Sequence, residues 1–483
     1  MDQLVTRSQT DGVVAETGQS SLFLLLAASV GCAMTLVDTN VVAIAVPEIA
    51  RSLNAGAAEA QCIISAFFLT FAASLLPAGV VADRLGRRRV FLLGLTGLGA
   101  TSLICGLAPG MVWLQLGRGM QGIAMAFVLS PALALIGHRF RGVAERNHAW
   151  AIWGGVMGVT MVVAPIGGGL IVQSFGWRWA FFLNIPICVA LAGAIKVYAE
   201  ESRDPTRGGL DPLGILLFAA SMFGLVWGLI NAQAQGWDSA ATLAGFALGI
   251  GALTGFIVAE RVQRHAMLNL GLFRDPKFVG AVWAMFAYAA TAQVMASLLP
   301  VFLQNGAGFS VVTAGFAMLP FALAMLVFPY VGARLGRRRS SAAILALGLA
   351  TVAVGNMVAG WGAYSQIWLL FLLGIFVTGS GAGLLNGETQ KAIMMAIPPN
   401  EAGVASGIGT TARFSGILIG FTALNTVLAF AAIRRSDPDP AATAFSMALF
   451  AAATVAALSA LVVWRLLRKA APRGRASPHM PNL

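Results

Sequence analysis

Fourteen apolar runs, separated by short polar or basic segments, make up most of this chain. Each run is near the roughly 20 residues that a helix needs to cross a bilayer. The predicted spans are, in order, 22–46, 61–81, 90–107, 111–136, 149–172, 179–198, 213–231, 241–259, 278–303, 311–332, 341–360, 367–389, 404–433 and 441–467. Strand-like alternation of apolar and polar residues is absent, so the pattern predicts an all-α integral membrane protein.

The composition also indicates a lipid environment, because 58% of the 483 residues are hydrophobic and only 10% are charged. The formal net charge of +12 does not indicate nucleic-acid binding, since the basic residues form short clusters between apolar runs instead of one patch. The cysteines lack metal-ligand spacing and are expected to be unpaired thiols inside or beside spans. They are Cys32, Cys62, Cys105 and Cys188.

The distribution of Lys and Arg predicts how the chain is oriented. With the N-terminus in the cytoplasm and the spans alternating, 25 of the 31 basic residues fall on the cytoplasmic side. This count places Lys391 in a cytoplasmic loop after the twelfth span. Such an asymmetry predicts that both termini are cytoplasmic.

A repeated hexapeptide predicts the domain organisation. The sequence Arg-Leu-Gly-Arg-Arg-Arg occurs at 84–89, after the second span, and again at 334–339, after the tenth. The repeat indicates either an internal duplication with a moving part in each half or simply two positive loops. The expected organisation is a cytoplasmic segment at 1–21, a six-helix bundle at 22–198, a linker with two additional spans at 199–277, a second six-helix bundle at 278–468, and a disordered cytoplasmic tail at 469–483.

Among the ionisable residues inside the predicted spans, four are candidates for a functional role, because insertion scales assign a charge there a cost of about 2.5–3.5 kcal/mol. Asp38 and Arg118 lie at comparable depth in the first and fourth spans and are able to pair. Such a pair either exchanges a proton when the arginine moves or a cationic ligand arrives, or locks the helices statically.

The other two are candidates for substrate binding or coupling. Glu388, near the inner end of the twelfth span, is alternatively a solvated group. Arg413, near the middle of the thirteenth, is alternatively a partner of backbone carbonyls.

No motif for nucleotide binding or enzyme chemistry accompanies these residues: GxxxxGK[ST], GxSxG and HExxH are all absent from the sequence. We therefore expect no enzyme activity, no cofactor and no metal site, and transport driven by an ion gradient or by the substrate's own gradient.

Several short motifs resemble those of a known family. Residues Gly79, Asp83, Arg84, Gly86, Arg87 and Arg88 resemble the loop 2–3 signature of the major facilitator superfamily. Its fourth-helix motif is matched at Arg118, Gln121 and Gly122, and its fifth-helix antiporter motif at Pro165, Gly168 and Gly169. Residues 38–47 and 176–186 resemble signatures of its fourteen-span drug:proton antiporter branch.

The resemblance implies a major facilitator fold, with two six-helix bundles and two inserted helices. It implies that Asp83 and the arginines after it form a cytoplasmic latch, and that Asp38 and Arg118 take part in proton coupling. Pro165 and the glycines after it would form a hinge and indicate export. In the second repeat, Ala333 stands where Asp83 stands in the first, so only the first copy carries the acidic half of the latch.

The sequence thus predicts a proton-coupled multidrug efflux transporter, in the bacterial inner membrane, that exports amphiphilic or cationic compounds by alternating access. Its expected partners are the lipid bilayer, a small-molecule substrate and protons, with one chain as the transport unit. By resemblance, a periplasmic adaptor and an outer-membrane channel are compatible with it. The alternatives are a dedicated exporter of one metabolite, an importer, or a receptor that does not transport.

Overall fold

The computed structural model describes residues 2–140, 142–203, 211–263, 267–398, 401–432 and 440–469. Within these ranges, fourteen helices are long and apolar enough to cross a membrane, which confirms the predicted number of spans. The predicted disordered tail lies outside the described residues, except for its first residue. So do parts of the predicted linker, at 204–210 and 264–266.

The first six spans and the inserted pair are built from nine helices. They are α1 (Asp2–Ser52), α2 (Ala57–Leu85), α3 (Arg87–Gly106), α4 (Met111–Arg139), α5 (Val143–Phe175), α6 (Trp179–Phe182), α7 (Asn184–Tyr198), α8 (Pro212–Gln235) and α9 (Ala240–Val262). The short α6 and α7 together form the sixth span, and α8 and α9 are the inserted pair.

The last six spans follow a short 3₁₀ helix, η1 (Leu270–Arg274). They comprise α10 (Pro276–Tyr288), η2 (Ala289–Gln293), α11 (Val294–Val301), η3 (Phe302–Gly306), α12 (Val311–Leu335), α13 (Ser341–Tyr364), α14 (Trp368–Ala396), α15 (Ala402–Ala432) and α16 (Pro440–Lys469). The ninth span is not one regular helix, because η2 and η3 are π-helical turns within it. Such turns are frequent at functional sites, and hydropathy does not predict them.

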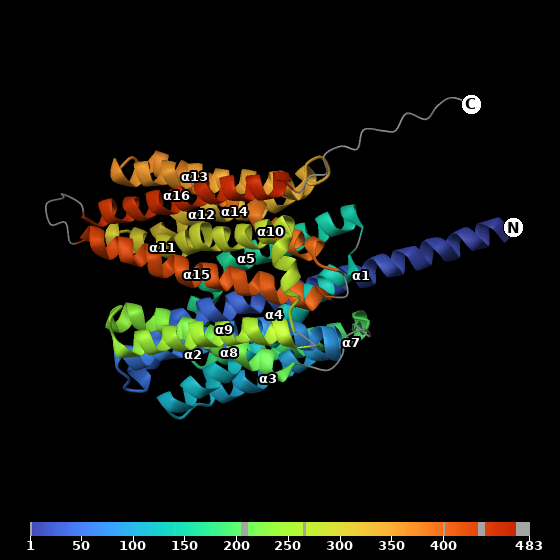
Figure 1. Cartoon of the computed structure of the whole chain (residues 1–483), viewed down its shortest axis with the longest axis horizontal. Helices are drawn as coiled ribbons and strands as arrows, with labels where there is room; N and C mark the ends of the chain where they lie inside the picture. The colour runs from blue at the N-terminus through green and yellow to red at the C-terminus, as the bar shows by residue number, and fades with distance from the viewer. Residues whose placement is uncertain are drawn as a thin grey trace.

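The helices form two groups, one above the other in Figure 1, with α10 to α16 in the upper group. The lower group holds α2, α3 and α7, and the pair α8–α9 packs against α2. The two groups meet along α2 with α15 and along α5 with α12 and α14. In Figure 1, the N-terminal end of α1 and the C-terminal end of α16 lie on the same side, which we call the terminal side.

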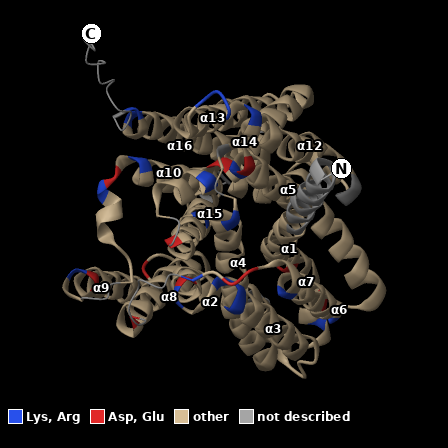
Figure 2. Ribbon diagram, turned by 90° about the vertical axis from the view of Figure 1, so that its right-hand side faces the viewer, with Lys and Arg blue, Asp and Glu red and all other residues tan. Residues whose placement is uncertain are grey.

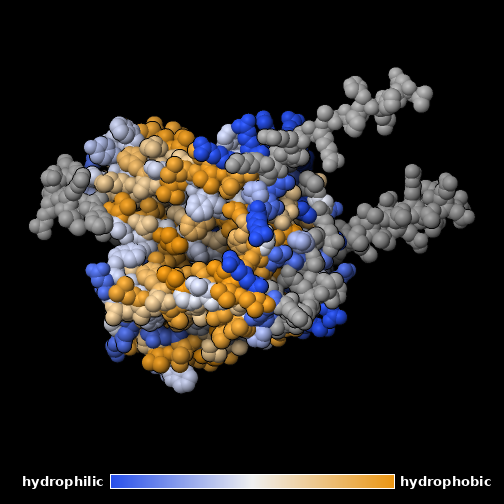
Figure 3. Space-filling view, in the orientation of Figure 1, coloured by the Kyte–Doolittle hydropathy of each residue, from blue (hydrophilic) through white to orange (hydrophobic). Residues whose placement is uncertain are grey.

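The surface agrees with a membrane environment. On the face shown in Figure 3, apolar side chains form a broad band, and hydrophilic ones lie toward the two ends. Figure 2 views the terminal side, where basic and acidic segments lie among the helix ends. The chain can therefore place its band in lipid and its charged ends in water.

Glycines allow the two groups to approach closely. A Cβ atom on Gly79 of α2 would overlap the backbone of Gly403 in α15, and the reverse also holds. A Cβ on Gly158 of α5 would lie 3.1 Å from the carbonyl oxygen of Met325 in α12. Larger side chains at these positions would separate the two groups.

The predicted hinge on the fifth span lies within a continuous helix, α5, which contains Pro165. Gly168 packs against α1, where a Cβ would lie 2.6 Å from Cγ2 of Val41. Gly169 has no neighbouring atom within 4 Å of such a Cβ. Of the two glycines, Gly168 therefore makes a close helix contact and Gly169 does not, and the hinge role stays a prediction.

One predicted boundary is wrong in a way that matters for the site. Helix α14 continues to Ala396, whereas the predicted span ends at residue 389. Lys391 is therefore a buried helix residue, 4% exposed, and not part of a loop. The polar pair Gln390–Lys391 looks like a loop in a hydropathy profile, but ion pairing keeps the lysine inside the helix bundle.

Candidate functional site

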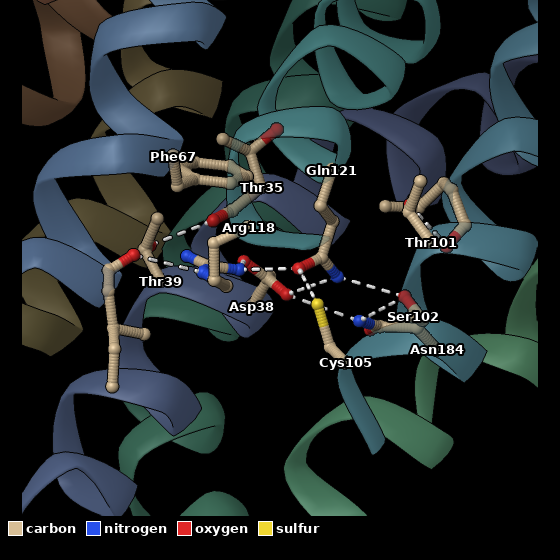
Figure 4. Close-up of polar contacts among 12 residues, drawn as sticks. Thr35, Asp38, Thr39, Phe67, Thr101, Ser102, Cys105, Arg118, Gln121 and Asn184 are labelled. Atoms are coloured by element: carbon tan, nitrogen blue, oxygen red, sulfur yellow. Dashed lines mark hydrogen bonds and ion pairs between the residues drawn. The ribbon is translucent and has the colours of Figure 1, made fainter. Parts of the chain in front are cut away.

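A buried polar cluster lies among helices α1, α3, α4 and α7, as Figure 4 shows. It is built from Asp38 of α1, Ser102 of α3, Arg118 and Gln121 of α4, and Asn184 of α7. Each of these side chains is at most 1% exposed. Four helices thus contribute polar groups to one site that water does not reach.

Asp38 is the centre of this cluster. Its Oδ2 lies 2.7 Å from Nη1 of Arg118, so the pairing considered from their similar depth is present. Its Oδ1 accepts hydrogen bonds from the amides of Gln121, at 3.1 Å, and Asn184, at 3.2 Å. The carboxylate therefore accepts from one cationic and two neutral donors, so its hydrogen-bonding capacity is met inside the protein.

Arg118 is held on several sides. Besides Asp38, its Nη1 donates to Oε1 of Gln121 at 2.7 Å, and its Nε donates to the carbonyl of Ile63 at 3.3 Å. The guanidinium carbon lies 4.2 Å from the centre of the Phe67 ring. Groups from α1, α2 and α4 therefore fix the position of this arginine.

Sequence reasoning assigned no role to three members of this cluster. Ser102 accepts from the Gln121 amide at 2.8 Å and from the Asn184 amide at 3.2 Å, which joins the two donors of Asp38. Gln121 and Asn184 both lie within the motifs quoted above, so the sequence could have identified them as candidate site residues. Ser102 lies outside those motifs, and only the fold brings it to the site.

The predicted latch joins the two groups of helices. Asp83, which is fully buried, lies 2.7 Å from Nη2 of Arg87. It also accepts from the backbone N–H groups of Gly403, at 2.8 Å, and Val404, at 2.9 Å. These N–H groups belong to the first turn of α15, so one carboxylate meets both an arginine and a helix N-terminus across the interface.

The rest of the latch loop is held by the segment that follows α7. Glu201 accepts from the backbone N–H groups of Arg88 and Arg89, both at 3.2 Å, at the start of α3. Arg88 Nη2 donates to the carbonyl of Lys196 at 2.7 Å. Gly86 has φ +111°, which favours glycine, and a Cβ there would lie 2.5 Å from Oε1 of Glu201.

Arg84, on the last turn of α2, is half-buried and close enough to Glu260 of α9 to interact with it electrostatically. The end of the inserted pair therefore lies beside the latch.

The second hexapeptide copy has a different structure. Gly336 has φ −63°, in the right-handed helical region, whereas Gly86 has a positive φ. Arg337, which corresponds to Arg87, is exposed. The same six residues therefore differ in structure: the first copy buries Arg87 against Asp83, and the second forms a turn in which Arg337 is exposed.

A second polar cluster joins α14 to α5 on the terminal side. Lys391 lies 2.5 Å from Oε2 of Glu388 and donates to Oδ1 of Asn147 at 3.0 Å. Glu388 is only 5% exposed, so it is not the solvated group that its place in the span allowed. A Cβ on Gly387 would lie 2.6 Å from the carbonyl oxygen of Trp150, which shows how close α14 and α5 are here.

Neutralising one member of this pair is expected to destabilise the protein. Lys391→Met leaves the Glu388 carboxylate buried without a counter-charge and should lower the free energy of unfolding by about 3 kcal/mol. The double variant Glu388→Gln, Lys391→Met should recover most of that loss. Thermal unfolding in detergent micelles measures both. A double variant as unstable as the single one would show that the contact with Asn147, not the charge balance, is what matters.

Arg413 of α15 lies between the two groups and is 7% exposed. Its Nη2 donates to Oδ1 of Asn386 at 3.0 Å and to the carbonyl of the same residue at 3.4 Å. Its guanidinium carbon lies 5.3 Å from the Trp153 ring centre and 5.7 Å from that of Tyr288. The contact with a backbone carbonyl, one of the two alternatives from the sequence, is present.

In the described ranges, no group of three or more His, Cys, Asp or Glu side chains is arranged to hold a metal ion. The four cysteines are unpaired, as expected.

Comparison with known proteins agrees with this architecture. The model of the Major Facilitator Superfamily matches residues 27–421 and, in a second match, 284–480. Multidrug resistance protein Stp of Mycobacterium tuberculosis is 32% identical over 430 residues, covering 87% of this chain and 80% of Stp. The tetracenomycin C resistance and export protein of Streptomyces glaucescens is 32% identical over 415 residues, covering 84% and 75%.

Among solved structures, the proton:xylose symporter XylE superposes with a TM-score of 0.66 over 93% of this chain and 96% of XylE, at 13% sequence identity. At that identity the likeness concerns the fold alone. The family match, the fourteen spans and the related proteins together show that this chain belongs to the major facilitator superfamily, as a multi-pass transporter of its fourteen-span drug:proton antiporter branch and not an enzyme.

Proposed function

We propose that this protein exports amphiphilic or cationic compounds in exchange for protons. The observation that carries the proposal is the buried ion pair of Asp38 and Arg118, whose atoms lie 2.7 Å apart. The relatives of this protein include a multidrug resistance protein and a tetracenomycin C resistance and export protein. These names support a drug-like substrate.

The coupling step uses the Asp38 cluster. In the arrangement described here, Arg118 compensates the carboxylate, so no proton is needed. When a conformational change or a substrate draws Arg118 away, the carboxylate takes up a proton from the side that is then open. Return of the arginine releases the proton. Alternating access makes uptake and release occur on opposite sides of the membrane.

We propose that the terminal side of the protein faces the cytoplasm. On this side the two groups are joined by Asp83 with the N-terminus of α15 and by Lys391 with Asn147. The arrangement is thus closed toward the cytoplasm, and the latch stabilises it. Opening the cytoplasmic side requires both sets of contacts to break, and the α5 segment around Pro165 serves as the hinge.

A reconstituted transport assay tests the proposal. Proteoliposomes that contain the full chain and an imposed pH gradient should accumulate several unrelated amphiphilic dyes, and each dye should induce proton movement. The expected dye gradient is about tenfold for one pH unit, if one proton moves per neutral substrate. Liposomes without protein are the control.

The alternatives give different results in the same assay. Uptake or export of a single defined solute, with no dye-induced proton movement, would replace drug export by a dedicated exporter or an importer. No gradient-dependent flux of any solute would favour a receptor.

A further inference from the structure

We propose that Arg413, Tyr288 and Trp153 form a binding site for the anionic oxygen of an aromatic amphiphile, such as an aromatic carboxylate or an acidic phenolate. This inference rests on the proposed export function and names a substrate class for it. The site draws on α15, the end of α10 and α5, so it lies between the two groups of helices.

The charge of Arg413 is not neutralised by a carboxylate. The described part of the chain contains four buried basic side chains. Arg87, Arg118 and Lys391 each lie within 2.7 Å of a carboxylate oxygen. Arg413 instead has the two neutral oxygens of Asn386. A buried guanidinium with only neutral acceptors retains a positive potential that attracts an anion.

Donor groups also remain available around this charge. The Nε–H of Arg413 and the hydroxyl of Tyr288, which is fully buried, have no hydrogen-bond partner within the described residues. A guanidinium can only donate, and a phenol is able to donate. Two buried donors that have no acceptor in the described residues fit an oxygen atom brought by a ligand.

Aromatic rings define the remainder of the site. The Trp153 and Tyr288 rings face the guanidinium carbon at 5.3 and 5.7 Å, and Trp150 lies edge-on to Trp153 at 5.6 Å between ring centres. Such rings offer faces and edges to an aromatic ligand, whose charged group then reaches Arg413.

The hydrogen bonds of Arg118 and Arg413 differ in a way that favours a ligand-binding role for Arg413. Arg118 donates to Asp38, Gln121 and a backbone carbonyl, so its hydrogen-bonding groups are largely used within the protein. Arg413 also differs in position, since Tyr288 immediately precedes the π-helical turn η2. That irregular turn lets the backbone near the ring change conformation when a ligand enters. Cationic substrates would have to bind away from Arg413.

A set of three probes on one scaffold tests the site: 1-pyrenebutyrate, its methyl ester, and 1-pyrenemethylamine. Their affinities for the full-length protein in detergent micelles are measured by pyrene fluorescence. The wild-type protein should prefer the carboxylate. Arg413→Gln should weaken carboxylate binding about 30-fold and leave the ester and the amine unchanged, as expected for loss of a buried charge partner. Arg413→Lys, which retains the charge, should recover part of the affinity.

Arg468→Gln is the matched control, because Arg468 also lies over a tryptophan ring, that of Trp464 at 4.9 Å, but is exposed. It should leave all three affinities unchanged. Equal weakening of the three probes by Arg413→Gln, or unchanged carboxylate binding, would overturn the proposed anion site.

The same probes keep this inference separate from proton coupling. Asp38→Asn should abolish pH-driven transport but leave the preference for the carboxylate intact. A wild-type protein that prefers the carboxylate but shows no pH-driven transport would contradict the coupling proposal alone.

Discussion

Asp38→Asn is expected to abolish proton-driven transport. The asparagine has nearly the same shape and can still accept a hydrogen bond from Arg118, but it cannot take up and release a proton. The loss of a positioned proton-transfer group should lower the pH-driven transport rate by about 100-fold. Exchange of substrate across the membrane without a pH gradient should persist, because it requires no net proton movement. Transport in proteoliposomes, with and without the gradient, measures both.

Stability has to be separated from coupling in this experiment. Neutralising Asp38 alone leaves Arg118 buried without a counter-charge, which costs about 3–5 kcal/mol. The double variant Asp38→Asn, Arg118→Gln restores the charge balance and should be more stable than the single variant, yet equally uncoupled. Glu48→Gln is the matched control, since Glu48 is the other carboxylate described on the membrane-spanning part of α1. Full proton exchange in Asp38→Asn would remove this residue from the mechanism.

Asp83→Asn is expected to impair switching between the two access states while membrane insertion stays normal. The substitution removes the charge that Arg87 and the N-terminus of α15 share, and such a charge at a partly buried helix N-terminus contributes up to about 2 kcal/mol. The cytoplasmic closure should weaken by that amount, which corresponds to a shift of about 30-fold in the balance of states. The transport rate should fall accordingly.

A cysteine at position 151 reports this opening directly. Ala151 is buried beside the cluster of Glu388 and Lys391, so Ala151→Cys should react slowly with a maleimide in an otherwise cysteine-free protein. Adding Asp83→Asn should accelerate the reaction. Asp275→Asn serves as control, because Asp275 caps α10 in an exposed position and asparagine caps equally well. Normal transport and unchanged labelling in Asp83→Asn would reduce the loop to a signal for topology.

The number of spans could be predicted because lipid imposes a simple rule: each crossing needs about 20 apolar residues whose backbone groups pair within the helix. The same rule made Asp38 and Arg118 conspicuous, and their similar depth suggested that they meet. What depth cannot supply is the direction of a side chain around the helix axis. The bonds from Gln121 and Asn184 to Asp38, and the role of Ser102, therefore emerge only from the packed structure.

Hydropathy also failed where a polar residue is compensated inside the protein. Lys391 was assigned to a loop because a lysine normally ends a span, and the compensation comes partly from Asn147, 244 residues away. The π-helical turns of the ninth span were not predicted either, although polar residues interrupt the apolar run there, at Thr291, Gln293, Gln304 and Asn305. For Lys391, the determining contact is therefore distant in sequence.

The two copies of the hexapeptide show that residues outside a repeated segment can give its two copies different structures. Their six letters are the same, yet the first turn is held by Glu201 and by Asp83, which pairs with Arg87, and the second is exposed. Substitutions outside the copied segment, at positions such as 83 and 201, therefore determine what the segment does. Evolution can then preserve the arginines for correct insertion into the membrane while it adds or removes the latch independently in each half.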